Sequence, residues 1–268
     1  MFPGFLFIIA SYPQMARYFL EVMYDGTAFH GSQLQGDTPT VQLEINKALQ
    51  TLFRIPIQSF GASRTDEGVH ALSNFYHFDT DGELYKDLVY KLNAILPAAI
   101  AVKSIFRAND PETNARFAAT SRRYRYRIYA RKHPFLHHRA LYYPFRVDIH
   151  ILHETAAALK EYTHFESFSK RNTQSKTFIC KIMDAHWEQH EGELHFVVEA
   201  NRFLRGMVRG LVGTQLQAAR GRFDVNGFRK IVEAQDCTKA DFSVAGHGLY
   251  LEAVNYPDGL LTELTHIR

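Results

Sequence analysis

Cysteine is scarce in this sequence of 268 residues, which contains only Cys180 and Cys237. Two cysteines cannot form a disulfide framework, and the 14 histidines show no zinc-ligand spacing, so we expect a cytoplasmic protein without a metal. Long apolar runs are also missing. None approaches the roughly 18–20 residues of a membrane span, so we expect no membrane contact. A P-loop and a glycine-rich dinucleotide fingerprint are absent, which predicts no nucleotide cofactor.

The overall composition is that of a soluble globular protein, with 46% apolar and 22% charged residues. These proportions exclude a disordered chain and a fibrous repeat. The length is sufficient for one large domain or for two domains of ordinary size, each with its own core.

Positive charge is concentrated in the second part of the chain. Residues 1–112 contain 8 Lys or Arg against 12 Asp or Glu, whereas residues 113–268 contain 23 against 16. Nine basic residues and no acid occur between 115 and 147, and a second acid-free basic run spans 202–222. Such runs interleaved with aromatic residues favour a polyanionic partner, nucleic acid first, although a solvated charged face fits either run alone.

The first sixteen residues differ in character from the rest of the chain. Residues 2–10 are apolar, but no basic residue precedes them, which argues against a signal peptide. Met15 directly precedes the first strand-like segment. We therefore expect residues 1–16 to be an N-terminal extension with the natural start near Met15, the alternative being an ordered extension that packs on a neighbour.

Residues 17–110 show the element order β-α-β-β-α-β, which is the ferredoxin-like order, and we expect them to form one half of the protein. Strands are predicted at 18–24, 57–61, 72–78 and 100–106, and helices at 41–53 and 84–96.

The same order recurs in residues 111–268, the expected basic half. Strands are predicted at 121–131, 178–188, 194–200 and 249–254, and helices at 151–162, 202–219 and 225–234. The predicted fold is therefore α+β: two ferredoxin-like halves joined through a central, mainly antiparallel sheet with flanking helices and a cleft between them.

Two patterns place arginines on defined faces. Alternation along 121–131 puts Arg123, Arg125 and Arg127 opposite Tyr124 and Tyr126, where we expect them to be buried against helices rather than to line a pocket. Within the predicted helix 202–219, Arg202, Arg205 and Arg209 are spaced i, i+3 and i+7, which places them on one face. An inward guanidinium is thus feasible there, although a surface ion pair is the usual role of a lone arginine.

The segment SRTDEGVHA at residues 63–71 is the candidate catalytic segment. It lies in the turn between two predicted strands, and a loop held by a rigid sheet is a suitable place for a reactive carboxylate such as Asp66. A simple solvated turn explains the spacing equally well. The adjacent Glu67 does not make a glycosidase pair, because two such carboxylates must flank the bond about 5–10 Å apart.

The segment RTDEGVHA at residues 64–71 resembles the catalytic loop of the tRNA pseudouridine synthase A family. Five further blocks match the family pattern in the same order over nearly the whole chain. They are residues 24–31 (YDGTAFHG), 114–126 (NARFAATSRRYRY), 164–168 (HFESF), 203–209 (FLRGMVR) and 248–251 (GLYL). One block is weak evidence, whereas six collinear blocks are strong.

The resemblance implies a role for five residues. Asp66 corresponds to the catalytic aspartate, Tyr124 to the tyrosine that stacks on the target uracil, and Arg209 to the basic residue that pairs with the aspartate. Arg64 corresponds to the arginine that helps to hold the flipped nucleotide, and Leu249 to the apolar residue under the base. The resemblance also implies the pseudouridine synthase fold, a homodimer, no metal or organic cofactor, and tRNA positions 38–40 as targets.

The residues suit that chemistry, because moving a glycosidic bond from ring nitrogen to ring carbon needs a carboxylate and proton transfers but no external group. A base inside a stacked stem-loop must flip out, and an aromatic platform such as Tyr124 then holds it, although core packing is the usual role of a lone strand tyrosine. We expect the phosphate contacts from the accessible basic residues Arg131, Lys132, Arg139, Arg202 and Arg205.

Two positions depart from the family pattern: Ser32 stands where tryptophan is usual, and Ser63 where glycine is usual. Neither is among the proposed chemical groups. The alternatives are a synthase with another RNA target, a catalytically silent RNA-binding paralogue, and a non-RNA protein with two ferredoxin-like units.

Overall fold

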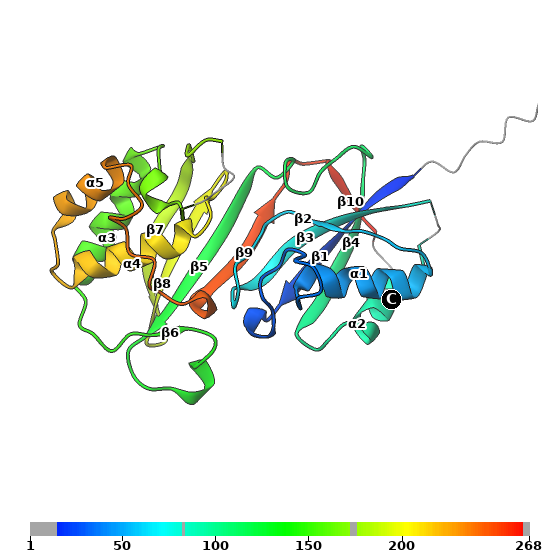
Figure 1. The fold of residues 1–268 in the computed structure, drawn as a ribbon, viewed down its shortest axis with the longest axis horizontal. Helices are drawn as coiled ribbons and strands as arrows, with labels where there is room; N and C mark the ends of the chain where they lie inside the picture. The colour runs from blue at the N-terminus through cyan, green and yellow to red at the C-terminus, as the bar shows by residue number, and fades with distance from the viewer. Residues whose placement is uncertain (1–14, 82–83, 172–175, 265–268) are drawn as a thin grey trace, which may run out of the picture.

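The computed structural model describes residues 15–81, 84–171 and 176–264. Most of the expected N-terminal extension therefore lies outside the described residues. Within them, ten strands form one continuous sheet that runs the length of the molecule, with helices gathered at both ends (Figure 1). No described helix is long and apolar enough to span a membrane.

The first half of the chain forms three long strands, one short strand and two helices. They are β1 (Ala16–Tyr24), α1 (Val41–Phe53), β2 (Phe60–Gly61), β3 (His70–Thr80), α2 (Leu88–Ile95) and β4 (Ile100–Ala108). The strand order is β4-β1-β3, with β2 paired to β3, and every pairing among these strands is antiparallel. This is the predicted ferredoxin-like order.

The second half repeats that order as β9-β5-β8-β7. Its elements are β5 (Ser121–Tyr129), β6 (Leu141–Tyr142), α3 (Ile149–Ala158), β7 (Ile182–His190), β8 (Glu193–Ala200), α4 (Met207–Ala219), α5 (Val225–Glu233), β9 (Leu249–Asn255) and β10 (Leu261–Glu263). The α+β fold predicted from the sequence is confirmed. The short strands β6 and β10 were not predicted, and β10 returns to the first half to pair with β4.

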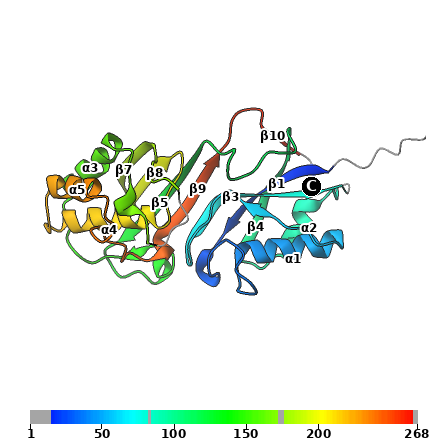
Figure 2. The same ribbon diagram turned by 45° about the horizontal axis from the view of Figure 1, so that its top comes forward.

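The two halves join edge to edge through β3 and β9. These strands pair in parallel over only two positions, His70 with Tyr250 and Ala71 with Leu251. The His70 and Tyr250 rings stack with centroids 4.6 Å apart. Figure 2 shows β9 and β3 side by side at the centre, between the two groups of helices. Residues just before β3 and just before β9 are thereby brought together.

Helices cover one face of the second half of the sheet. Trp187 of β7 donates a hydrogen bond to Gln215 of α4 at 3.0 Å, and Trp187, Phe196 and Tyr126 are neighbours across three strands and all buried. The side chains that alternate with them therefore point to the opposite face of the sheet.

Two predicted elements are shorter than expected for a local reason. Helix α4 begins at Met207 rather than at 202, because Gly206 has φ +74°, a left-handed conformation that cannot continue a right-handed helix. Arg202 and Arg205 thus precede the helix and do not share a face with Arg209. Strand β2 covers only Phe60–Gly61, since Asn46 of α1 accepts the backbone N–H of Ser59 at 2.9 Å.

One buried arginine links distant backbone segments. The guanidinium of Arg122 donates to the carbonyl oxygens of Ala119 and Asn201, both at 3.0 Å, to that of Ala62 at 3.4 Å, and to that of Arg116. Burial lowers the pKa of this side chain, and no described carboxylate pairs with it. Four carbonyl dipoles therefore stabilise the buried charge, and in return the charge holds three chain segments together, at residues 62, 116–119 and 201.

Arg122→Met should lower the free energy of unfolding by about 2–4 kcal/mol, because it leaves several buried carbonyls without a donor. The matched control is Arg123→Met, one residue along β5 on the more open face, which should lose about 1 kcal/mol or less. Urea denaturation monitored by circular dichroism measures both. Equal losses in the two variants would contradict the bridging role of Arg122.

Candidate active site

The loop at residues 63–69 connects β2 to β3 and carries Asp66 near its tip. The Asp66 side chain is 33% exposed, so one side of the carboxylate faces solvent and the other faces the protein. The backbone turns tightly here: Val69 N–H donates to the Asp66 carbonyl at 3.2 Å, and Gly68 adopts φ +75°. The carboxylate is thus accessible on a loop of defined shape.

Ser32 holds the loop from the side of the first helix. Its backbone N–H donates to the Thr65 carbonyl at 3.0 Å, and its hydroxyl accepts the Thr65 N–H at 2.8 Å. Gly31 packs so close to the Thr65 carbonyl that a Cβ would lie 2.9 Å from it. A small residue that can both donate and accept therefore fits this position, which gives a physical reason for the departure from tryptophan.

A buried hydrogen-bond network supports the loop from below. The Tyr24 hydroxyl lies 2.9 Å from Thr65 Oγ1, and Asn74 Nδ2 donates to the Ser63 carbonyl at 3.1 Å and to Tyr24 at 3.3 Å. Burial raises the pKa of Tyr24, so its phenol stays protonated at neutral pH. The Ser63 hydroxyl is buried and has no hydrogen-bond partner in the described part of the chain.

His70 fastens the other end of the loop. Gly26 N–H points at Nδ1 at 3.1 Å, which leaves the ring proton on Nε2, 3.1 Å from the carbonyl oxygens of both His138 and His247. Burial lowers the pKa of His70, which keeps the ring neutral despite the nearby carboxylate of Asp25. The loop is therefore anchored to segments from both halves.

Arg209, in the first turn of α4, faces Asp66 across the junction. Its Nη1 lies 3.9 Å from Asp66 Oδ2, at the edge of ion-pair distance. The same guanidinium donates from Nε to the Val244 carbonyl at 2.8 Å and from Nη2 to the Phe242 carbonyl at 3.4 Å. These two carbonyl oxygens hold the guanidinium in place, so the orientation of Arg209 does not depend on Asp66 alone.

Tyr124 and Leu249 are buried beside this pair. The Tyr124 ring meets Phe203 edge to face with centroids 5.1 Å apart. Burial raises the pKa of Tyr124, and the nearby Asp66 charge raises it further. Leu249 is the first residue of β9 and pairs with Tyr126. The segment just before it packs against the Asp66 loop, so closely that a Cβ on Gly246 would collide with the Glu67 carbonyl. The structure thus gathers Asp66, Arg209, Tyr124 and Leu249 at the junction of the halves.

The remaining predicted basic residues lie in two separate places. Arg64 and Arg205 are exposed and Arg202 is half-buried, and no described carboxylate pairs with any of them. Arg131, Lys132 and Arg139 are exposed on the connection between β5 and β6. Of these, Arg139 is held by Asp25, with Nη2 3.0 Å from Oδ2.

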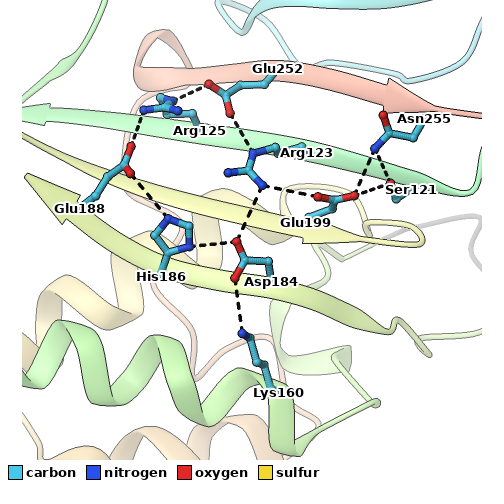
Figure 3. Close-up of polar contacts among 10 residues, drawn as sticks. All are labelled: Ser121, Arg123, Arg125, Lys160, Asp184, His186, Glu188, Glu199, Glu252 and Asn255. Carbon is cyan, nitrogen blue, oxygen red and sulfur yellow. Dashed lines mark hydrogen bonds and ion pairs between the residues drawn. The ribbon is translucent and has the colours of Figure 1, made fainter. Parts of the chain in front are cut away.

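The arginines that alternate with Tyr124 are neutralised by acids from neighbouring strands. Arg125 bridges Glu252 and Glu188, both at 2.5 Å, and Arg123 contacts Glu252 at 3.4 Å and Glu199 at 3.5 Å (Figure 3). The expectation that these residues pack against helices is wrong, because they lie on the sheet face opposite the helices. Basic residues that form a run without acids in the sequence are therefore paired, in the folded protein, with acids from other strands.

Sequence reasoning missed the residues that build the loop's support, chiefly Tyr24, Ser32, Asn74 and Arg122. Most of their partners are backbone carbonyl and N–H groups, which every residue possesses and which leave no pattern in a sequence. Tyr24 and Arg122 lie inside matching blocks, so the blocks pointed to them without indicating what they do.

Comparison with known proteins places the chain in one family. A family model described as tRNA pseudouridine synthase matches residues 158–257. Proteins named tRNA pseudouridine synthase A are similar over almost their whole length. That of Parabacteroides distasonis is 46% identical over 92% of this chain and 98% of its own, and that of Bacteroides thetaiotaomicron is 43% identical over 94% of each. That of Bacillus subtilis is 37% identical over 88% and 97%. The chain belongs to the tRNA pseudouridine synthase A family.

Proposed function

We propose that this protein isomerises uridine to pseudouridine at positions 38–40 of the tRNA anticodon stem-loop, with Asp66 as the catalytic carboxylate. The observation that carries the proposal is the Asp66–Arg209 pair, an accessible carboxylate on an anchored loop with a fixed guanidinium 3.9 Å away. The relatives' names supply the reaction class and the tRNA substrate.

The reaction breaks the bond from the ribose C1′ to uracil N1 and forms a bond from C1′ to C5, with loss of the C5 proton to solvent and gain of a proton at N1. Asp66 acts as the anion that attacks the sugar or the base, and Arg209 orients it. The detached uracil must stay in the site while it turns. Tyr124 stacked on it and Leu249 under it provide apolar surfaces that hold the ring without fixing its orientation.

Flipping and RNA binding are assigned to the exposed cations. Arg64, two residues before Asp66, helps to hold the extruded nucleotide, and the phosphate path runs over Arg131, Lys132 and Arg139 on one side and Arg202 and Arg205 on the other. We further propose that residues 17–110 and 111–268 act as two halves of one enzyme, and that the enzyme works in the cytoplasm as a homodimer.

Asp66→Asn should leave folding intact and lower turnover at least about a thousandfold, because the amide has nearly the same shape but cannot act as the anion. The matched control is Glu67→Gln, an exposed neighbouring carboxylate that should retain near wild-type activity. Tritium release from tRNA labelled at uridine C5 measures turnover, and mapping of pseudouridine in tRNA from a deletion strain tests positions 38–40. Near wild-type turnover by Asp66→Asn would overturn the assignment.

Tyr124→Leu should reduce kcat/KM by about fivefold to 150-fold if stacking is worth about 1–3 kcal/mol, and Tyr124→Phe should reduce it far less. Phe keeps the ring and loses only the hydroxyl, which the raised pKa of Tyr124 keeps protonated at neutral pH. The alkaline side of the pH–rate profile should therefore be the same in the wild type and in Tyr124→Phe. Equally severe losses in both variants would instead indicate proton transfer by the hydroxyl.

Changing Arg131, Lys132 and Arg139 together to Ala should weaken tRNA binding and reduce the log–log salt slope by about two units. The reduction falls short of three because Asp25 already neutralises Arg139. At saturating tRNA the rate should recover. Arg229→Ala, which removes a cation paired with Glu161 at 2.8 Å on α5, is the control and should leave the slope unchanged. An unchanged slope in the triple variant would place the RNA path elsewhere.

A further inference from the structure

The turn between β4 and β5 presents a phenylalanine to solvent. Phe117 is 78% exposed, among the most exposed large apolar side chains in the described residues. The guanidinium of Arg116 lies 5.6 Å from the centre of its ring. Leaving a whole aromatic ring in water forgoes about 2 kcal/mol of burial free energy, so its position calls for a physical explanation.

Mobility of the turn does not explain this exposure. Asn114 Oδ1 accepts the backbone N–H of Arg116 at 2.9 Å and that of Phe117 at 3.4 Å. Arg122 donates to the Arg116 carbonyl, and the preceding Ala115 is fully buried, with its carbonyl accepting from the Tyr256 hydroxyl at 2.7 Å. The backbone on both sides of the ring is therefore fixed, and the ring is held in place outside the core.

The charges nearest to this ring are positive. Burial lowers the pKa of Arg116, and so does the proximity of Arg64, Arg122 and Arg202. Among the described residues no carboxylate pairs with Arg64, Arg116 or Arg202, in contrast to Arg123 and its neighbours on the other sheet face. A rigid aromatic ring beside uncompensated guanidinium groups suits a ligand that joins a flat ring to phosphates.

The turn is also coupled to the catalytic loop. Arg122, which holds the Arg116 carbonyl, donates at the same time to the carbonyl of Ala62 at the start of the loop. Arg64 belongs to that loop, and Tyr124 follows Arg122 by two residues on the same side of β5. A polynucleotide whose target base lies at Tyr124 would therefore pass close to Phe117.

We propose that Phe117 and Arg116 form a second stacking platform, which takes an unpaired nucleobase of the tRNA next to the target uridine. The proposal rests on the proposed function, since it assigns this ring to the same RNA. Arg116 covers one side of the ring, and the open side receives the base. Stacking of this kind tolerates any base, so the platform sets the path of the strand and not the identity of the nucleotide.

The test uses the full-length protein and unmodified tRNA transcribed in vitro. Phe117→Ala should raise the Kd about fivefold to 150-fold, with the salt slope and the rate at saturating tRNA near wild type. Arg116→Ala should instead reduce the salt slope by about one unit. Tyr90→Ala, which removes a 70% exposed aromatic side chain on α2, is the matched control and should bind as the wild type does.

A fluorescence experiment tests stacking directly. The chain has a single tryptophan, Trp187, which is buried, so Phe117→Trp adds an exposed reporter. Its emission should be quenched when tRNA binds, whereas Tyr90→Trp should not respond. A Kd for Phe117→Ala within twofold of wild type, or an unquenched Trp at 117, overturns the platform even if the enzyme is active. Failure of the proposed function is detected separately, as isomerisation that does not depend on Asp66.

Discussion

The buried guanidinium of Arg122 is the constraint on which the arrangement of the site depends. A charge removed from water must be compensated, and here four backbone carbonyls provide the compensation. Those carbonyls belong to the residue before the Asp66 loop, to residues 116 and 119 of the connection into β5, and to the residue before Arg202. Two segments that are distant in the sequence, at Ala62 and Asn201, are thereby set relative to residues 116–122 around one side chain, with Tyr124 two residues away.

Sequence composition cannot distinguish two groups of arginines that the structure separates. On the open face of the second half, Arg123, Arg125 and Arg127 are matched by acids from β7, β8 and β9, so their charge is neutralised within the sheet. Near the junction, Arg64, Arg116 and Arg202 lie close to one another without such partners among the described residues. The second group therefore leaves a positive field outside the protein, near Asp66.

The candidate site is assembled from both halves although β3 and β9 pair over only two positions. His70 connects the end of the Asp66 loop to the carbonyls of His138 and His247, and Arg209 is held by carbonyls of the segment before β9. The first half therefore contributes Asp66, and the second half contributes Arg209 together with the carbonyl acceptors that orient it. The position of the reactive groups depends on the junction as much as on either half.

The order of the main strands and helices could be predicted from the residues alone, because the periods of the apolar residues and the turn residues act locally and recur in the same order in both halves. The matching blocks also named Asp66, Arg209 and Tyr124 as candidates, and the structure places these three residues near one another. The tertiary structure alone decided which arginines keep a free charge, where Arg202 and Arg205 lie once Gly206 delays the start of α4, and how Ser32 and Arg122 hold the loop. Those outcomes depend on acids and carbonyls supplied by distant strands, and such pairings are formed only when the chain has folded.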